Sequence, residues 1–114
     1  MHILTNLREV FAEYLEDNQF YQNPKELYEP NNYFLNIGGK RMRPVLVLLG
    51  AHLYRNNLKD ALPAALAIEY FHNFSLIHDD MMDNAPIRRG KTTIHEKYGP
   101  NTAVLSGDVL LVYA

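Results

Sequence analysis

Three aspartates in the segment DDMMD form the densest group of chemically active side chains in the sequence. On a helix, Asp79 and Asp83 lie about 40° apart in azimuth and one turn along, so both carboxylates can face one ion, with Asp80 about 80° from Asp79. Like charges this close repel one another unless a cation lies between them. Mg²⁺ prefers oxygen ligands and usually combines one or two carboxylates with waters and a substrate phosphate. The spacing therefore predicts a magnesium site that receives a phosphorylated ligand.

The alternative interpretation is a solvated helix end whose carboxylates pair with the nearby Arg88 and Arg89. Apolar residues surround the acidic group, which favours a partly desolvated cluster over a fully wet helix end. Such clusters are candidates for functional sites. These apolar neighbours are Phe71, Phe74, Leu76, Ile77, Met81 and Met82.

Two short basic segments are the natural partners of an anionic ligand. The segment GGKRMRP at 38–44 joins a flexible turn to a predicted helix start, where free N–H groups favour an anion. Lys40 and Arg43 would add charge-assisted hydrogen bonds to phosphate oxygens. The second basic segment, Arg88-Arg89, lies in a predicted loop just after the carboxylates and suits a diphosphate that is bridged to the metal from the other side. The alternatives are a solvated basic turn at 38–44 and a simple ion pair between Arg88 and Asp83.

His72 lies seven residues before Asp79, which on a helix corresponds to about 20° in azimuth and roughly 10 Å along the axis. One helix face could therefore serve two anions, although a buried core histidine is the competing interpretation. Together, the carboxylates, the basic segments and the surrounding apolar side chains predict a ligand that has both phosphate groups and a hydrocarbon chain. Prenyl diphosphates have both.

Helices are expected to position these residues. Amphipathic spacing predicts a first helix, whereas Pro24 and Pro30 predict a connector followed by a short helical piece. Pro44 opens an apolar helix. A long segment without glycine or proline from residue 64 until Pro86 predicts one helix of about six turns that carries the aspartates and ends at Asn84. The expected ranges are 3–17 for the first helix, 18–30 for the connector, 33–37 for the short piece and 44–57 for the apolar helix.

The remaining segments are also expected to contain helices and loops but no strands. A charged loop, IRRGK, precedes a short helix that Thr92 or Thr93 would cap and that ends near Tyr98. After Gly99, a last apolar helix is expected to run to the end of the sequence without a terminating signal. The chain is therefore predicted to be all-α and to be cut inside its last helix.

Composition excludes several other classes of protein. The 114 residues allow one small domain, and the net charge of −2 argues against a dedicated nucleic-acid binder. The absence of cysteine removes disulfides, thiol nucleophiles and thiolate metal sites. No apolar stretch approaches the roughly 20 residues of a membrane span. No secretory signal opens the sequence, so a cytoplasmic location is expected.

Three segments closely resemble the N-terminal part of the trans-type isoprenyl diphosphate synthases, the polyprenyl synthetase family. They are residues 38–44, 72–99 and 106–111. The resemblance implies that residues 1–114 form the N-terminal part of a single isoprenoid synthase domain. That domain is an antiparallel helical bundle around a deep central cavity, usually a homodimer.

The resemblance also implies a Mg²⁺-dependent prenyltransferase. Isopentenyl diphosphate would add head-to-tail to an allylic prenyl diphosphate whose C–O bond has broken, in a cavity that excludes water. The implied metal ligands are Asp79 and Asp83, with Asp80 in support. The implied contacts to isopentenyl diphosphate are Lys40, Arg43, His72 and Arg89, and the implied contact to the allylic diphosphate is Arg88.

Product length would depend on Phe74 and Ser75, which precede Asp79 by one to one and a half turns. In the family a bulky residue there resembles a floor, so Phe74 suggests farnesyl or geranylgeranyl diphosphate as the product, with room beside Ser75. The alternative is that Phe74 packs into a neighbouring helix and limits nothing.

The second aspartate-rich motif of the family is missing from these 114 residues. We therefore expect this piece to be inactive alone. A non-catalytic regulatory subunit of a heteromeric synthase is the main alternative, and a helical interaction module is another. A terpene cyclase shares the DDxxD motif but would not need Lys40, Arg43 and Arg89 for a second diphosphate.

Overall fold

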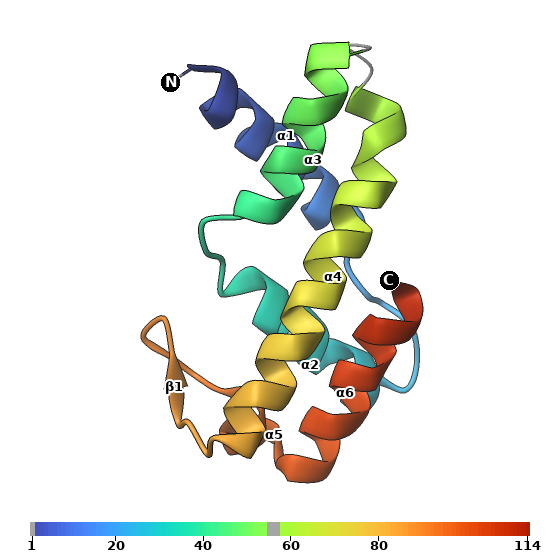
Figure 1. Ribbon diagram of the computed structural model, residues 1–114. Helices are drawn as coiled ribbons and strands as arrows, with labels where there is room; N and C mark the ends of the chain where they lie inside the picture. The colour runs from blue at the N-terminus through green and yellow to red at the C-terminus, as the bar shows by residue number, and fades with distance from the viewer. Residues whose placement is uncertain (1, 55–57) are drawn as a thin grey trace. The chain divides into compact units, whose positions relative to one another are not determined.

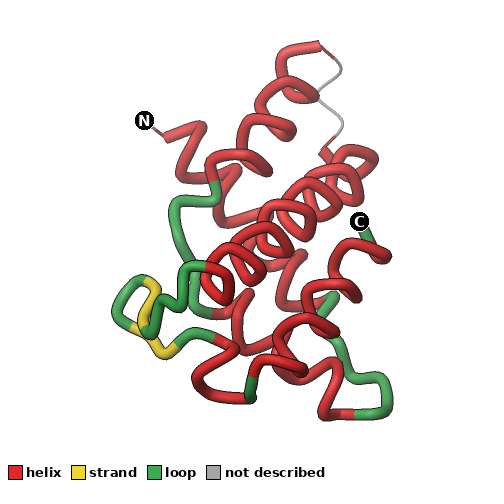
Figure 2. Tube along the Cα trace, turned by 60° about the horizontal axis from the view of Figure 1, so that its bottom comes forward, coloured by secondary structure: helices red, strands yellow, loops and turns green. Residues whose placement is uncertain are grey.

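Helices account for most of the residues that the computed structural model describes, which are 2–54 and 58–114 (Figure 1). Within these described ranges, strand is confined to a small hairpin (Figure 2). The predicted all-α class is therefore confirmed. No helix in the described ranges is long and apolar enough to cross a membrane. The helices are α1 (His2–Asp17), α2 (Lys25–Asn36), α3 (Met42–Tyr54), α4 (Leu58–Met82), α5 (Ile94–Tyr98) and α6 (Pro100–Tyr113).

The chain divides into two compact units, of which the first comprises residues 1–19 and 40–69. In this unit α1 packs against α3. The expected helix at 3–17 is confirmed. The expected helix at 44–57 begins two residues earlier, at Met42, and its predicted end lies outside the described residues. The buried apolar side chains of this unit are Leu7, Phe11, Leu15, Val45, Leu48, Ala65 and Leu66.

The second unit comprises residues 20–39 and 70–114, and α2, α5 and α6 pack against one another in it. An aromatic cluster joins its helices around Phe20. The centroid of the Phe20 ring lies 5.7 Å from that of Tyr28 in α2, 5.5 Å from that of Tyr70 in α4 and 5.2 Å from that of Tyr113 in α6. Because this unit carries residues 70–114, it holds the C-terminal part of α4 with the aspartates.

Helix α2 corrects the predicted connector at 18–30. The helix begins at Lys25, directly after Pro24, and continues through Pro30 to Asn36. Pro30 removes one backbone hydrogen bond, which normally breaks a helix. Here Pro30, Phe34 and Leu35 are buried. We attribute the continuous helix to the burial of these side chains. Their burial offsets the free-energy cost of the lost hydrogen bond, which from the local sequence alone would be expected to end the helix.

The end of α4 follows the prediction. Asn84 takes a left-handed conformation with φ of 55°, and its N–H donates to the carbonyl of Met81 at 3.2 Å. The N–H of Ala85 donates to the carbonyl of Asp80 at 2.9 Å. These bonds satisfy carbonyls that the last helical turn leaves open and turn the chain sharply after the aspartates.

The predicted charged loop is instead a small antiparallel hairpin. Strand β1 (Ile87–Arg88) pairs with β2 (Lys91–Thr92), and Arg89 and Gly90 form the turn with φ of 50° and 77°. Positive φ at both central residues is the geometry of a type I′ turn, whose twist matches that of paired strands. Sequence periodicity could not reveal strands this short.

Thr93 occupies the predicted N-cap position of α5, but its side chain does not cap that helix. Its hydroxyl instead donates to the carbonyl of Ala85 at 2.8 Å. The N–H of Thr93 donates to the carbonyl of Pro86 at 3.0 Å. These two bonds connect the chain after the hairpin to the turn that ends α4. Thr93 is fully buried, so the bonds are shielded from water.

Candidate active site

Asp79 and Asp83 present exposed carboxylates on adjacent turns at the C-terminal end of α4. The helix ends at Met82, yet the N–H of Asp83 still donates to the carbonyl of Asp79 at 2.8 Å. This bond keeps the helical spacing through Asp83. The pair therefore lies on adjacent turns, as the sequence spacing predicts. Both residues are nevertheless exposed, and Asp80 alone among the three aspartates has the buried position that the apolar neighbours led us to expect.

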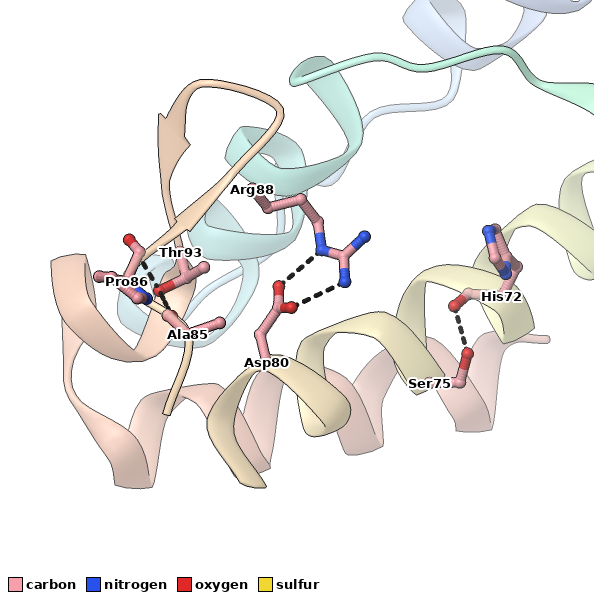
Figure 3. Close-up of polar contacts among 7 residues, drawn as sticks. All are labelled: His72, Ser75, Asp80, Ala85, Pro86, Arg88 and Thr93. Carbon is pink, nitrogen blue, oxygen red and sulfur yellow. Dashed lines mark hydrogen bonds and ion pairs between the residues drawn. The ribbon is translucent and has the colours of Figure 1, made fainter. Parts of the chain in front are cut away.

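Asp80 is different from its two neighbours because it is buried and already has a partner. Nε of Arg88 donates to Oδ2 of Asp80 at 2.8 Å, and Nη2 donates to Oδ1 at 2.7 Å (Figure 3). The side chain of Asp80 is only 6% exposed. Such a bidentate pair is both strong and directional. It is the Arg88 ion pair that the sequence suggested, but with Asp80 in place of Asp83.

The electrostatics of Arg88 reflect this partner. The hydrogen bonds to Asp80 raise the pKa of Arg88, burial opposes them, and the charges of Asp80 and Asp79 raise the pKa further. The guanidinium therefore stays charged. Its position beside the aspartates comes from β1, which the chain reaches through the tight turn after α4.

The three carboxylates are not gathered at one point. Across the described ranges, no group of three or more His, Asp or Glu side chains is arranged to hold a metal. Two exposed carboxylates on adjacent turns are nevertheless the kind of donor set that Mg²⁺ uses together with waters and phosphates. The side chains of Asp79 and Asp83 thus fit this ion, and Asp80 would contribute by holding Arg88 beside it.

The basic segment at 38–44 contains three cations, Lys40 and Arg41 directly before α3 and Arg43 in its first turn. Arg41 has φ of 54°, and its Nη1 lies 3.6 Å from Oε2 of the buried Glu69 within the first unit. Lys40 and Arg43, in contrast, are exposed. The ion pair with Glu69 gives Arg41 a structural partner within the protein.

Arg89 reaches from the hairpin turn to the glycines that precede Lys40. Its Nη1 donates to the carbonyl of Gly38. Arg89 itself is exposed. The structure therefore brings Arg89 and the carbonyl of Gly38 together within the second unit, although they are distant in sequence.

His72, Phe74 and Ser75 lie on α4 upstream of the aspartates and are half-buried. The hydroxyl of Ser75 donates to the carbonyl of His72 at 2.6 Å (Figure 3). The ring of Phe74 contacts Phe71 at 5.6 Å and His78 at 4.8 Å between centroids. The side chain of Phe74 thus rests between aromatic rings of its own helix.

His78 is a residue whose role the sequence did not reveal. Its Nε2 lies 3.2 Å from the carbonyl of Val104 on α6. A side chain at Gly107 would approach the imidazole to 2.5 Å, so glycine provides the space that His78 fills. A helical glycine paired with a histidine elsewhere in the chain gives no recognisable sequence signal.

Comparison with known proteins identifies relatives of this chain. The sequence model of the polyprenyl synthetase family matches residues 24–114. A geranylgeranyl diphosphate synthase of Methanosarcina mazei is 49% identical over 87 residues, which are 76% of this chain and 27% of that protein. A farnesyl diphosphate synthase of Micrococcus luteus is 46% identical over 99 residues, which are 85% of this chain and 34% of that protein.

Solved structures give the same result. A geranylgeranyl pyrophosphate synthase crystal structure matches with a TM-score of 0.93 and 48% identity, covering 96% of this chain and 34% of that one. The chain thus spans about a third of the length of such relatives. Because the family model matches most of the chain, from residue 24 to residue 114, the chain belongs to the polyprenyl synthetase family.

Proposed function

We propose that this chain is the N-terminal part of a single isoprenoid synthase domain that condenses isopentenyl diphosphate with an allylic prenyl diphosphate. The observation that carries the proposal is the arrangement at the end of α4. Two exposed carboxylates, Asp79 and Asp83, stand on adjacent turns beside an arginine that Asp80 holds by two hydrogen bonds. The names of the relatives, geranylgeranyl and farnesyl diphosphate synthase, support a short-chain product.

Asp79 and Asp83 would hold Mg²⁺, with Asp80 in support. When bound, the ion supplies Lewis-acid stabilisation of the diphosphate leaving group. Arg88 would donate hydrogen bonds to the allylic diphosphate as negative charge develops on it. A preorganised donor is effective because it does not have to reorient during the reaction, and the pair with Asp80 provides that preorganisation.

The second diphosphate would be bound by the basic residues Lys40, Arg43 and Arg89, together with His72. These residues orient isopentenyl diphosphate so that its double bond faces the allylic carbon, which raises the effective concentration of the two reactants. Apolar side chains around α4, including Phe74, would exclude water from the reacting carbons. In this reaction the allylic C–O bond would break with departure of diphosphate, and the double bond of isopentenyl diphosphate would form the new C–C bond. Loss of a proton to the departing diphosphate would then complete head-to-tail elongation.

A condensation assay on the complete gene product tests this proposal. Labelled isopentenyl diphosphate is supplied with allylic primers of several lengths and with Mg²⁺, in the presence or absence of a chelator. We expect Mg²⁺-dependent formation of farnesyl or geranylgeranyl diphosphate. Failure to form any elongated product would contradict the proposal and would favour a non-catalytic subunit.

The same preparation tests the expected homodimer by sedimentation, and fractionation of cells tests the expected cytoplasmic location.

A further inference from the structure

Gly39 marks a close approach between the segment after α2 and the hairpin turn. Nη1 of Arg89 donates to the carbonyl of Gly38, the residue before it. A side-chain carbon on Gly39 would lie 2.6 Å from Cζ and 2.9 Å from Nη2 of Arg89. Both distances are shorter than any ordinary carbon contact. The guanidinium therefore fills the space that any other residue at position 39 would need.

The two partners of this contact are both attached to α2. On one side, the N–H of Gly38 donates to the carbonyl of Leu35 at 3.4 Å. On the other side, the hydroxyl of Tyr33 donates to the carbonyl of Thr92 in β2 at 2.6 Å. Because one helix carries both attachments, the position of the hairpin relative to the glycines is fixed within the second unit.

The backbone of Arg89 is fixed as well. Arg89 and Gly90 form the hairpin turn, with Arg88 paired to Lys91 directly before and after it. A guanidinium has five N–H donors in a rigid plane, and the one carbonyl of Gly38 accepts only a part of them. Because Arg89 is exposed, the N–H groups of its guanidinium that do not bind Gly38 remain accessible to an anion.

We propose that Gly39 is a positioning residue for isopentenyl diphosphate. Its missing side chain lets Arg89 dock on the Gly38–Gly39 peptide, and this contact orients the guanidinium toward the diphosphate. The inference rests on the proposed function, in which Arg89 and Lys40, the residue directly after Gly39, bind that substrate. Gly39 acts through Arg89 and does not itself touch the ligand.

The test uses Gly39→Ala and Gly38→Ala in the complete gene product. Both glycines have positive φ, 138° and 89°, so both substitutions strain the backbone. Only position 39 faces Arg89, because a side chain on Gly38 would meet nothing within 4 Å. Gly38→Ala therefore controls for strain, and the difference between the variants isolates the displacement of Arg89.

Binding of isopentenyl diphosphate is measured by calorimetry, and its KM is compared with the KM for the allylic diphosphate. Loss of a hydrogen bond to a charged group predicts that Gly39→Ala weakens binding of isopentenyl diphosphate by about tenfold or more, and Gly38→Ala by far less. The KM for the allylic substrate should stay nearly constant. The double variant Gly39→Ala/Arg89→Ala should bind no more weakly than Arg89→Ala, because the two changes remove the same contact.

Equal losses in the two glycine variants, or additive losses in the double variant, would overturn the inference. If Gly39→Ala does not fold, Arg89→Lys replaces it. Lysine keeps the charge but lacks the planar fork, so it should weaken isopentenyl diphosphate binding to a similar extent, and unchanged binding would overturn the inference. Absence of isopentenyl diphosphate binding by the unaltered protein would instead contradict the proposed function.

Discussion

Arg88 binds both carboxylate oxygens of Asp80, at 2.8 and 2.7 Å, while Asp79, the residue next to Asp80, remains exposed. Adjacent aspartates of one motif thus have different tasks. Asp80 turns inward and fixes an arginine, whereas Asp79 turns outward, where a cation and a phosphate can reach it. The division follows from helix geometry, because neighbouring residues point about 100° apart.

Substitution of Asp80 by Asn should therefore destabilise the protein, whereas Asp79→Asn should not. Asp80→Asn keeps the shape but removes the charge that holds a partly buried arginine, for which we expect a loss of about 1 to 3 kcal/mol in the free energy of unfolding. Asp79 is exposed, and its replacement should change that free energy by less than about 0.5 kcal/mol. Denaturant titration of the two variants of the complete gene product measures both values. Equal destabilisation by the two changes would contradict the division of tasks.

Much of this arrangement was accessible from the sequence. The long helix that carries the aspartates and its end near Asn84 followed from the absence of glycine and proline up to residue 85 and from the turn-forming residues after it. The spacing of Asp79 and Asp83 then followed from helix geometry. These features depend on local interactions, which a sequence displays directly.

Other features depend on contacts between distant residues and were not predictable. Helix α2 continues through Pro30 because tertiary burial offsets a local penalty. The partner of Asp80 depends on a hairpin whose strands have two residues each, too few to show alternation. The hydroxyl of Thr93 bonds to Ala85 and not to its own helix, a choice that only the folded chain decides.

Gly107→Ala should destabilise the second unit by steric conflict. A side chain there would approach Nε2 of His78 to 2.5 Å and Cδ2 to 2.7 Å, closer than packed atoms allow. Overpacking of this kind typically costs about 1 to 3 kcal/mol. Thermal unfolding of the complete gene product should show a lower Tm for this variant.

The matched control for that substitution is Gly50→Ala, also in a helix, where an added carbon would meet nothing within 4 Å. Alanine favours a helix over glycine, so Gly50→Ala should leave Tm unchanged or raise it. Combining Gly107→Ala with His78→Ala should recover part of the loss. A Tm for Gly107→Ala equal to that of the unaltered protein would contradict the close packing of His78 against α6.

Phe74→Ala should lengthen the product. Phe74 lies on α4 upstream of the aspartates, with its ring fixed between Phe71 and His78. If the growing hydrocarbon chain extends along this part of α4, removing the ring opens space for further additions of isopentenyl diphosphate. Chromatography of the reaction products of the complete gene product measures the chain length, and an unchanged product distribution would remove this role from Phe74.

The most direct test of the account is a calorimetric titration of the complete gene product with Mg²⁺ and a non-reactive prenyl diphosphate analogue, added separately and together. We expect cooperative uptake, because exposed carboxylates at Asp79 and Asp83 and the diphosphate oxygens would share the same ion. Asp79→Asn and Asp83→Asn should abolish the effect of Mg²⁺ on analogue binding. Analogue binding that is the same with and without Mg²⁺ in the unaltered protein would contradict the central claim.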